Sequence, residues 1–162
     1  MQNLRNCLIF VFLISDFSGK AQCECKSIPQ SDSSIYLFCQ PVYTAVDSIS
    51  KIQIGISGFG VDRFIHASIT FSSHPQYFNS GLGIITEDDS SWICVLVQRQ
   101  LKDIDGIPTA NGLFSITPEE LNRLRTKRIK SVTFYLEDGN MHTLNVEMIS
   151  DNLPVQIDCV NK

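Results

Sequence analysis

The stretch KIQIGIS, residues 51–57, gives the clearest indication of the fold. Its three isoleucines alternate with polar or small residues, and a period of two is typical of a β-strand with one buried face. Gly58-Phe59-Gly60 follows as a turn. Apolar side chains then occupy every second position of residues 65–71, and His66 falls on the other, more polar face. These features together predict a β-hairpin.

Two further hairpins are expected later in the chain. Residues 82–86 and 92–99 flank an acidic turn at residues 87–90. Residues 92–97 are nearly continuously apolar, which favours a strand that is covered on both faces. The third hairpin, residues 132–148, turns at Glu137-Asp138-Gly139-Asn140, and its Asp-Gly pair is a strong hairpin signal.

The connecting segments are expected to be less regular. Residues 35–39 are apolar and aromatic and predict a short strand before Pro41. Residues 72–80 and 102–112 are interpreted as loops, because both contain polar residues together with proline or glycine. Residues 151–162 are expected to add a final strand or a turn.

One helix is predicted, over about residues 118–126. Thr117 is suited to cap it, Pro118 suits the first helical position, and Glu120 completes a capping box. Leu121 and Leu124 would then share one face. The predicted fold is therefore mainly β, an antiparallel sheet or sandwich built from hairpins with one short α-helix.

The N-terminus has the pattern of a secretory signal. Arg5 precedes an apolar run at residues 7–14, and small residues allow cleavage after Ala21. We expect a signal peptide at 1–21, a linker at 22–34 and a single domain at 35–162. No segment is apolar over the roughly 20 residues that a transmembrane helix needs. The expected location is secreted or periplasmic.

The mature chain would have 141 residues, with 11 basic and 16 acidic ones and a formal charge of −5. That length suits one domain with a sizeable core. The charge gives no strong positive field, so nucleic acid is not an expected partner.

The number of cysteines in the mature chain is odd. Cys7 leaves with the signal and five cysteines remain. An exported chain is free to form disulfides, and an odd count leaves at least one cysteine out. In one account Cys23 is the acylated first residue of an outer-membrane lipoprotein, although Gln22 occupies a position where such signals have a small residue.

In the second account, which we favour, Cys94 stays as a thiol because it lies in the most apolar stretch. Two disulfides, with three possible connectivities, then join Cys23, Cys25, Cys39 and Cys159. A zinc site at Cys23-Glu24-Cys25 is less favoured, because the second pair of ligands is missing.

No catalytic, metal or cofactor motif is evident. The three histidines, His66, His74 and His142, stand in no recognised metal spacing, and no G-x-S-x-G motif occurs. The acidic clusters at 87–89 and 103–105 lack a full calcium-loop spacing and are interpreted as solvated turns. We therefore predict no cofactor and no catalytic residue.

Two surface features are candidate partner contacts. A basic cluster follows the predicted helix at Arg123, Arg125, Lys127, Arg128 and Lys130. Cations there favour the helix dipole, and the alternative is a patch for an anionic lipid, polysaccharide or protein. Phe59, between two glycines, either anchors a partner or folds back over the sheet edge. The candidate contacts are Phe59, Arg123, Arg125 and Arg128.

Residues 114–124 (FSITPEELNRL) and 129–139 (IKSVTFYLEDG) resemble a block in small uncharacterised exported proteins of Bacteroidota. Signal peptides in that group often end in Ala-Gln, similar to Ala21-Gln22. The resemblance covers residues 112–148 and the signal. It implies a periplasmic or surface β-rich domain and no active site.

The sequence therefore predicts an exported, non-enzymatic binding or interaction domain of the cell envelope. Its expected partner is an unknown protein or an anionic envelope component. One alternative is an inhibitor or immunity-type protein directed against an envelope protein. Another is a small envelope hydrolase that uses an acidic pair, or His66 with a serine.

Overall fold

The computed structural model describes residues 25–31, 33–40, 43–46, 50–71, 74–149 and 153–161. Within these ranges the chain forms ten strands and two helices. The strands are β1 (Cys25–Pro29), β2 (Ile35–Cys39), β3 (Tyr43–Val46), β4 (Ser50–Phe59), β5 (Asp62–Phe71), β6 (Phe78–Thr86), β7 (Ser91–Ile104), β8 (Ile107–Ser115), β9 (Ile129–Leu136) and β10 (Met141–Ile149). The helices are α1 (Pro118–Leu124) and α2 (Leu153–Val160). The predicted mainly-β class is confirmed.

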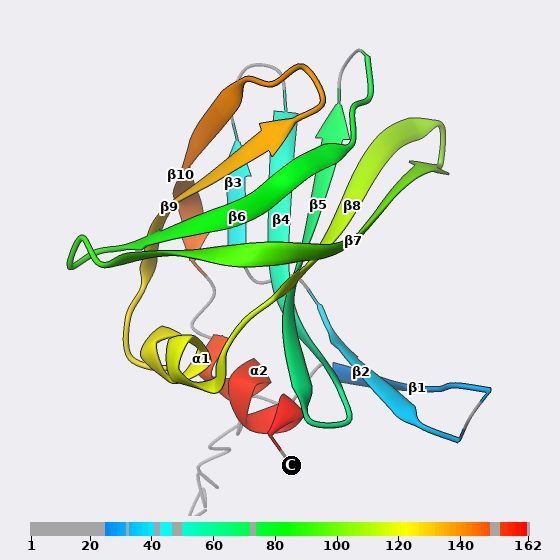
Figure 1. Ribbon diagram of the computed structural model, residues 1–162, viewed down its shortest axis with the longest axis vertical. Helices are drawn as coiled ribbons and strands as arrows, with labels where there is room; N and C mark the ends of the chain where they lie inside the picture. Colours follow the sequence, from blue (N-terminus) through cyan, green and yellow to red (C-terminus); the bar gives the residue numbers. More distant parts are fainter. Residues whose placement is uncertain are drawn as a thin grey trace, which may run out of the picture.

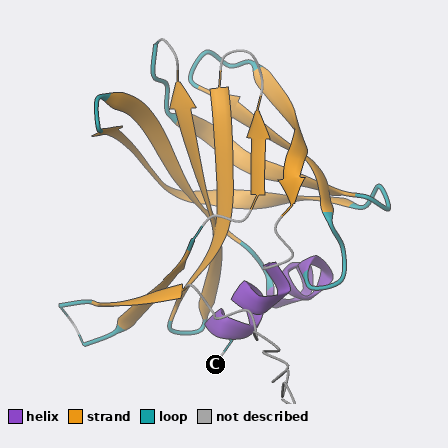
Figure 2. Cartoon of the chain, turned by 180° about the vertical axis from the view of Figure 1, so that it is seen from behind, coloured by secondary structure: helices purple, strands orange, loops and turns teal. Residues whose placement is uncertain are grey.

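All strand pairs are antiparallel and follow the order β1-β2-β4-β3-β10-β9-β6-β7-β8-β5, with a further pairing of β4 and β5. The strands from β3 to β10 thus form a continuous ring of pairs. Strands β3, β4 and β5 run upright at the back, and β6, β7 and β9 cross them at the front (Figure 1). The view from behind shows the same two layers (Figure 2). This crossed arrangement encloses the core between the two inner faces.

The isoleucines of residues 51–57 point into this core, as predicted. Ile52, Ile54 and Ile56 are each at most 1% exposed. From the opposite layer Phe78 contributes a ring that meets Phe114 and Phe134 edge-on, at centroid distances of 5.2 and 5.8 Å. Such edge-to-face pairs add to the stabilisation that burial of the rings provides.

Helix α1 begins as predicted and ends at Leu124, two residues earlier than expected. The Thr117 side chain accepts a hydrogen bond from the Glu120 backbone N–H at 3.2 Å, and the Glu120 carboxylate accepts one from the Thr117 N–H at 2.9 Å. Leu121 and Leu124 are buried. The capping box thus determines where the helix starts, and burial of its apolar face holds it in place.

The prediction of a loop at 102–112 is wrong. Strands β7 and β8 run through this segment and turn only at Asp105-Gly106, where both residues have positive φ (55° and 81°). The Asp103 carboxylate accepts a hydrogen bond from the Gly106 N–H at 2.7 Å. A two-residue Asp-Gly turn makes a tight hairpin possible within a polar stretch.

Strand β7 also differs from the expectation that both of its faces are covered. Ile93, Val95 and Val97 are 72%, 64% and 57% exposed. The strand pairs with β6 through residues 91–94 and with β8 through residues 95–104. It therefore passes from one layer to the other, and only its inner face is buried.

Three other segments differ from prediction. Residues 25–29, within the expected linker, form β1 and pair with β2. Strand β6 begins at Phe78, inside the expected loop at 72–80, and β3 was not predicted. The final segment is helix α2 and not a strand or turn. Leu153, Ile157 and Val160 are buried at helical spacing, so an apolar helical face, and not a period of two, determines the structure there.

Candidate functional site

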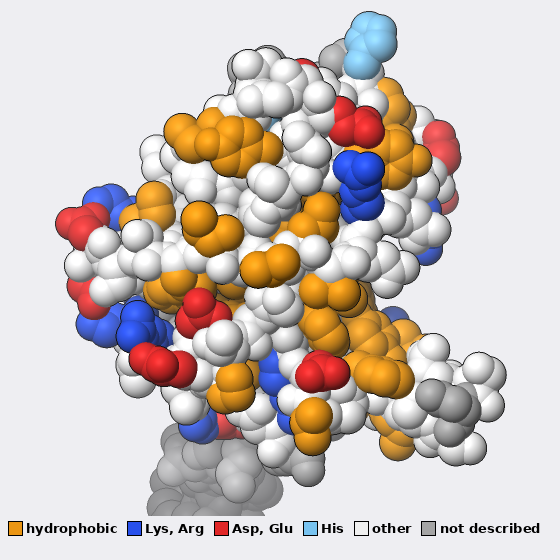
Figure 3. Space-filling model, in the orientation of Figure 1, with side chains coloured by type: hydrophobic (Ala, Val, Ile, Leu, Met, Phe, Trp, Pro, Cys, Tyr) orange, Lys and Arg blue, Asp and Glu red, His pale blue; other side chains and the backbone are white. Residues whose placement is uncertain are grey.

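The candidate site lies between two hairpins that project from the same side of the molecule. These are β1–β2 and β7–β8 (Figures 1 and 2). Between them is a pocket of about 540 Å³, which we call the hairpin groove. Figure 3 shows the surface hollowed on this side, above the β1–β2 hairpin. Its volume falls within the range of small-molecule binding sites.

The lining of the hairpin groove is aromatic and polar. The aromatic members are Tyr36, Phe38 and Phe59; the carboxamides are Gln30, Gln98, Gln100 and Asn111; the basic members are His66, Arg99 and Lys102. No Asp or Glu is among the lining residues that the structure describes. The groove thus offers flat apolar faces and neutral hydrogen-bonding groups.

The aromatic wall arises from strand register. Tyr36 of β2 lies opposite Phe59 of β4, and Phe38 lies opposite Ser57, so alternate residues of paired strands share one face. Phe59, a predicted partner contact, is half-buried and lines the groove. It lies beside the β1–β2 hairpin and does not stand free at a hairpin tip.

His66 forms part of the groove floor and is 7% exposed. Its ring stacks on Phe38 with centroids 4.3 Å apart. On the neighbouring strand, a Cβ atom at Gly55 would come within 2.5 Å of the ring, so only glycine fits beside it. Burial lowers the pKa of the imidazole to about 4, so the ring is neutral at neutral pH.

The hydrolase alternative requires His66 to lie beside a serine and a carboxylate. In the structure neither ring nitrogen of His66 has a hydrogen-bond partner among the described residues. The nearby Ser68 hydroxyl donates to Asn111 at 2.6 Å. The described residues also contain no cluster of three His, Cys, Asp or Glu side chains that would hold a metal ion. These residues do not assemble a nucleophile, a base and an orienting group.

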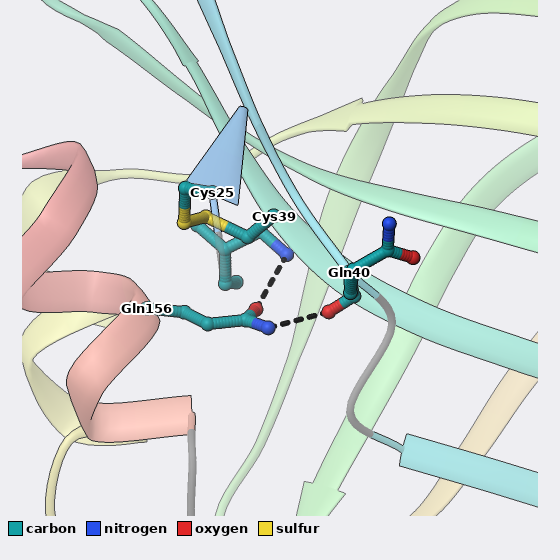
Figure 4. Close-up of a disulfide and its surroundings, with 5 residues drawn as sticks. Cys25, Cys39, Gln40 and Gln156 are labelled. Carbon is teal, nitrogen blue, oxygen red and sulfur yellow. Dashed lines mark hydrogen bonds between the residues drawn. A yellow bond between two sulfur atoms is a disulfide. The ribbon is translucent and has the colours of Figure 1, made fainter. Parts of the chain in front are cut away.

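A disulfide between Cys25 and Cys39 closes the base of the β1–β2 hairpin (Figure 4). These two cysteines are opposite each other in the strand pair. Cys159 is also disulfide-bonded, and Cys23 lies outside the described residues. Cys94 is a buried free thiol, and burial raises its pKa to about 12. Three of the four predicted disulfide cysteines are therefore oxidised, and the expected leftover thiol is free.

Helix α2 supports the same hairpin through Gln156. The edge of β4 pairs with β3 through residues 51–54 and with β2 through residues 57–59. Between these two paired stretches of β4, the Gln156 carboxamide accepts a hydrogen bond from the Ile56 N–H at 3.4 Å and donates one to the Gln40 carbonyl (Figure 4). The side chain thus satisfies the buried Ile56 N–H, which no neighbouring strand reaches, together with the Gln40 carbonyl.

The basic cluster contains several ion pairs. Arg123 pairs with Glu119 at 2.8 Å, and Arg125 pairs with Asp158 of α2. Lys127 and Lys130 pair with Asp88 and Asp89 of the β6–β7 turn at 2.5 and 2.6 Å. An anionic partner would compete with these carboxylates. The predicted contacts Arg123, Arg125 and Arg128 also lie outside the lining of the hairpin groove.

No protein-family model, curated protein or solved structure gives a significant match to this chain.

Neither described helix has the length and apolar character needed to cross a membrane. Because no known protein gives a significant match to the chain, the function of the site is inferred from the geometry of its residues. The sequence indicated Phe59 as a partner contact and His66 as a residue of the hydrolase alternative, but it did not predict the groove. The available signal was the alternation of Gln98, Gln100 and Lys102 along one face of β7. It became informative only when β8 placed that face beside His66 of β5.

Proposed function

We propose that this protein is an exported binding domain that holds its ligand in the hairpin groove without covalent chemistry. The observation that carries the proposal is the lining of the groove: aromatic rings and carboxamides surround a neutral histidine, and no carboxylate faces the pocket among the described residues. Such a pocket is suited to hold a ligand by contact and hydrogen bonding.

The way in which the hairpin is anchored supports binding. The Cys25–Cys39 disulfide joins the two strands of the β1–β2 hairpin, which forms the roof of the groove. The Gln156 hydrogen bonds and the stacking of Phe38 on His66 connect this hairpin to the rest of the fold. A preformed site loses less conformational entropy on binding than a flexible one, so more of the contact energy contributes to affinity.

Export is part of the proposal. At its N-terminus a basic residue, an apolar run and small residues follow one another, as in a signal peptide. Disulfides at Cys25, Cys39 and Cys159 support an oxidising compartment, because they persist there and are rare in the cytosol. The resemblance to exported Bacteroidota proteins points the same way. We place the protein in the periplasm or outside the cell.

The fluorescent dye anilinonaphthalene sulfonate (ANS) provides a direct test, because it is aromatic and small enough for a groove of about 540 Å³. We expect saturable binding of one dye per folded chain. Gln100→Trp, which places a bulky ring in the groove from an exposed position, should weaken binding at least tenfold. Asn145→Trp, at an exposed position on β10, is the matched control and should leave it unchanged. Absence of binding, or equal binding by both variants, would contradict the proposal.

A second candidate function, a domain that blocks another envelope protein, is favoured by the exposed apolar stripe of Ile93, Val95 and Val97. With p-benzoylphenylalanine at position 95, irradiation in the native envelope should give one discrete protein adduct. The same photoreactive residue at position 145 should give none. Identical patterns from the two positions would exclude a specific contact through the stripe.

A further inference from the structure

We infer that the ligand of the hairpin groove is a neutral oligosaccharide chain, an inference that rests on the proposed function. A sugar ring presents an apolar C–H face and a rim of hydroxyl groups. A binding site for it needs flat aromatic faces together with uncharged groups that both donate and accept hydrogen bonds. The hairpin groove brings these two kinds of group together.

The aromatic faces come from Tyr36 and Phe59. One face of Phe38 is already occupied by the His66 ring, whereas Tyr36 and Phe59 lie opposite each other in register and are both only partly buried. The faces of aromatic rings carry partial negative charge, which attracts the polarised C–H groups of a sugar. These two rings therefore form the platform for a pyranose ring.

The neutral hydrogen-bonding groups come from β7. Gln98 and Gln100 are exposed and project from the same face, and their side-chain carboxamides make no hydrogen bond within the described part of the chain. Their spacing of two residues corresponds to about 7 Å along a strand. Each carboxamide has two N–H donors and an acceptor oxygen, which matches hydroxyl groups that do both. Two such groups in a row suit a chain of sugars.

His66 adds a site for one hydroxyl. Its neutral imidazole has one donor and one acceptor nitrogen, and neither is satisfied among the described residues. A buried polar group without a partner is costly, so a ligand hydroxyl that reaches it would gain affinity. A neutral imidazole offers no charge to an ionic ligand.

The charges in the groove argue against a charged ligand. No carboxylate faces the groove among the described residues, so a cation has no counter-ion. Of the basic side chains, Arg99 donates to the Phe78 carbonyl at 3.0 Å and lies over the Tyr77 ring. Arg99 keeps its charge but is engaged by these two contacts, and Lys102 is the other charged side chain of the lining. We expect shape and hydroxyl recognition to dominate over charge.

Most of the backbone around the groove is already paired, which limits where an extended peptide could bind. Strands β2, β5 and β8 each pair on both sides, so their N–H and C=O groups are already used. Within the described ranges, unpaired edges remain along β7 over residues 98–104 and along β1, which pairs with β2 alone. A peptide that binds by strand addition needs such an edge, whereas a sugar binds through side chains.

The test measures displacement of ANS by soluble glycans. The panel contains laminarin, mannan and xyloglucan as neutral chains, alginate as an acidic chain, and an alternating Val-Thr hexapeptide as an extended peptide. We expect at least one neutral glycan to displace the dye. Tyr36→Ala and the pair Gln98→Ala with Gln100→Ala should each weaken that glycan at least tenfold, and Asn145→Ala should not.

Other results would overturn the inference. If ANS binds in the groove but no neutral glycan displaces it, the sugar inference fails while the proposed function stands. Displacement by alginate alone or by the peptide alone also overturns it. If ANS itself does not bind, the proposed function fails as well, so the two failures are distinguishable. Circular dichroism of each variant shows whether a lost signal reflects loss of the fold.

Discussion

The ring of His66 stacks on the ring of Phe38, with centroids 4.3 Å apart and planes inclined by 27°. The two residues belong to β5 and β2, which do not pair with each other and are joined only through β4. The contact therefore links the floor of the hairpin groove to its roof. We therefore expect a change in the charge of His66 to affect the position of the β1–β2 hairpin.

We predict that stability depends on pH through His66. Burial lowers its pKa from 6.5 to about 4, so the unfolded chain takes up a proton over this interval that the folded chain does not. The free energy of unfolding should therefore fall as the pH decreases from 6.5 to 4. The contribution of this histidine to the fall is about 3 kcal/mol. Urea titrations at several pH values measure it.

His66→Phe keeps a stacking ring and removes the titration, so its stability should change much less over this pH interval. His74→Phe, at an exposed position outside the groove, is the control and should follow the wild-type profile. Parallel profiles for the wild type and His66→Phe would show that another group causes the pH dependence.

The Cys25–Cys39 disulfide should stabilise both the fold and the groove. Replacing both cysteines by serine removes a cross-link that closes a 14-residue separation, a loss of about 3 kcal/mol in the free energy of unfolding. The two strands of the β1–β2 hairpin also lose their covalent link, so ANS affinity should fall. Denaturation and dye titration on the same sample separate the two effects. Unchanged dye affinity would mean that the roof is held without the disulfide.

Gln156 should contribute more to the free energy of unfolding than its place on a short terminal helix suggests. Gln156→Leu leaves the Ile56 N–H and the Gln40 carbonyl without this partner, a cost of about 1–3 kcal/mol for a buried group. Asp158→Ala, which removes an exposed ion pair on the same helix, should cost under about 1 kcal/mol. Equal losses in guanidinium denaturation would show that helix α2 contributes only through its apolar face.

Cys94 should be unreactive in the folded protein. Burial raises its pKa to about 12, so the thiolate is scarce at pH 8 and the sulfur is inaccessible. Iodoacetamide without reductant should label it only in denaturant. Mass spectrometry of the peptide that contains Cys94 detects the label. Rapid labelling under native conditions would mean that β6 and β7 separate readily.

Local features of the sequence allowed much of the fold to be predicted. The alternation in residues 51–57 identified the buried face of β4, and Thr117 with Glu120 identified the start of α1. At the β9–β10 turn Gly139 has φ of 77°, and the Asp138 carboxylate accepts from the Asn140 N–H at 2.9 Å, as its Asp-Gly pair suggested. These signals act within a few residues, so no knowledge of distant partners is needed.

The groove could not be predicted in the same way. Residues 26–34 are polar and turn-prone in sequence, and residues 26–29 become part of a strand through their pairing with β2. The helical conformation of α2 was not predicted. It becomes evident in the structure, where Leu153, Ile157 and Val160 pack into the core. The apolar run at 92–97 gave no hint that Ile93 and Val95 would face solvent.

The sequence by itself therefore determined which face of β4 is buried, where α1 begins, and which cysteine remains a buried thiol. Only the tertiary structure decided that the strands close into a ring, that Gln156 joins β4 where its partner changes from β3 to β2, and that Tyr36, His66 and Gln100 meet in one groove. The reason is that alternation and capping depend on neighbouring residues. Register between distant strands depends instead on how the whole core packs.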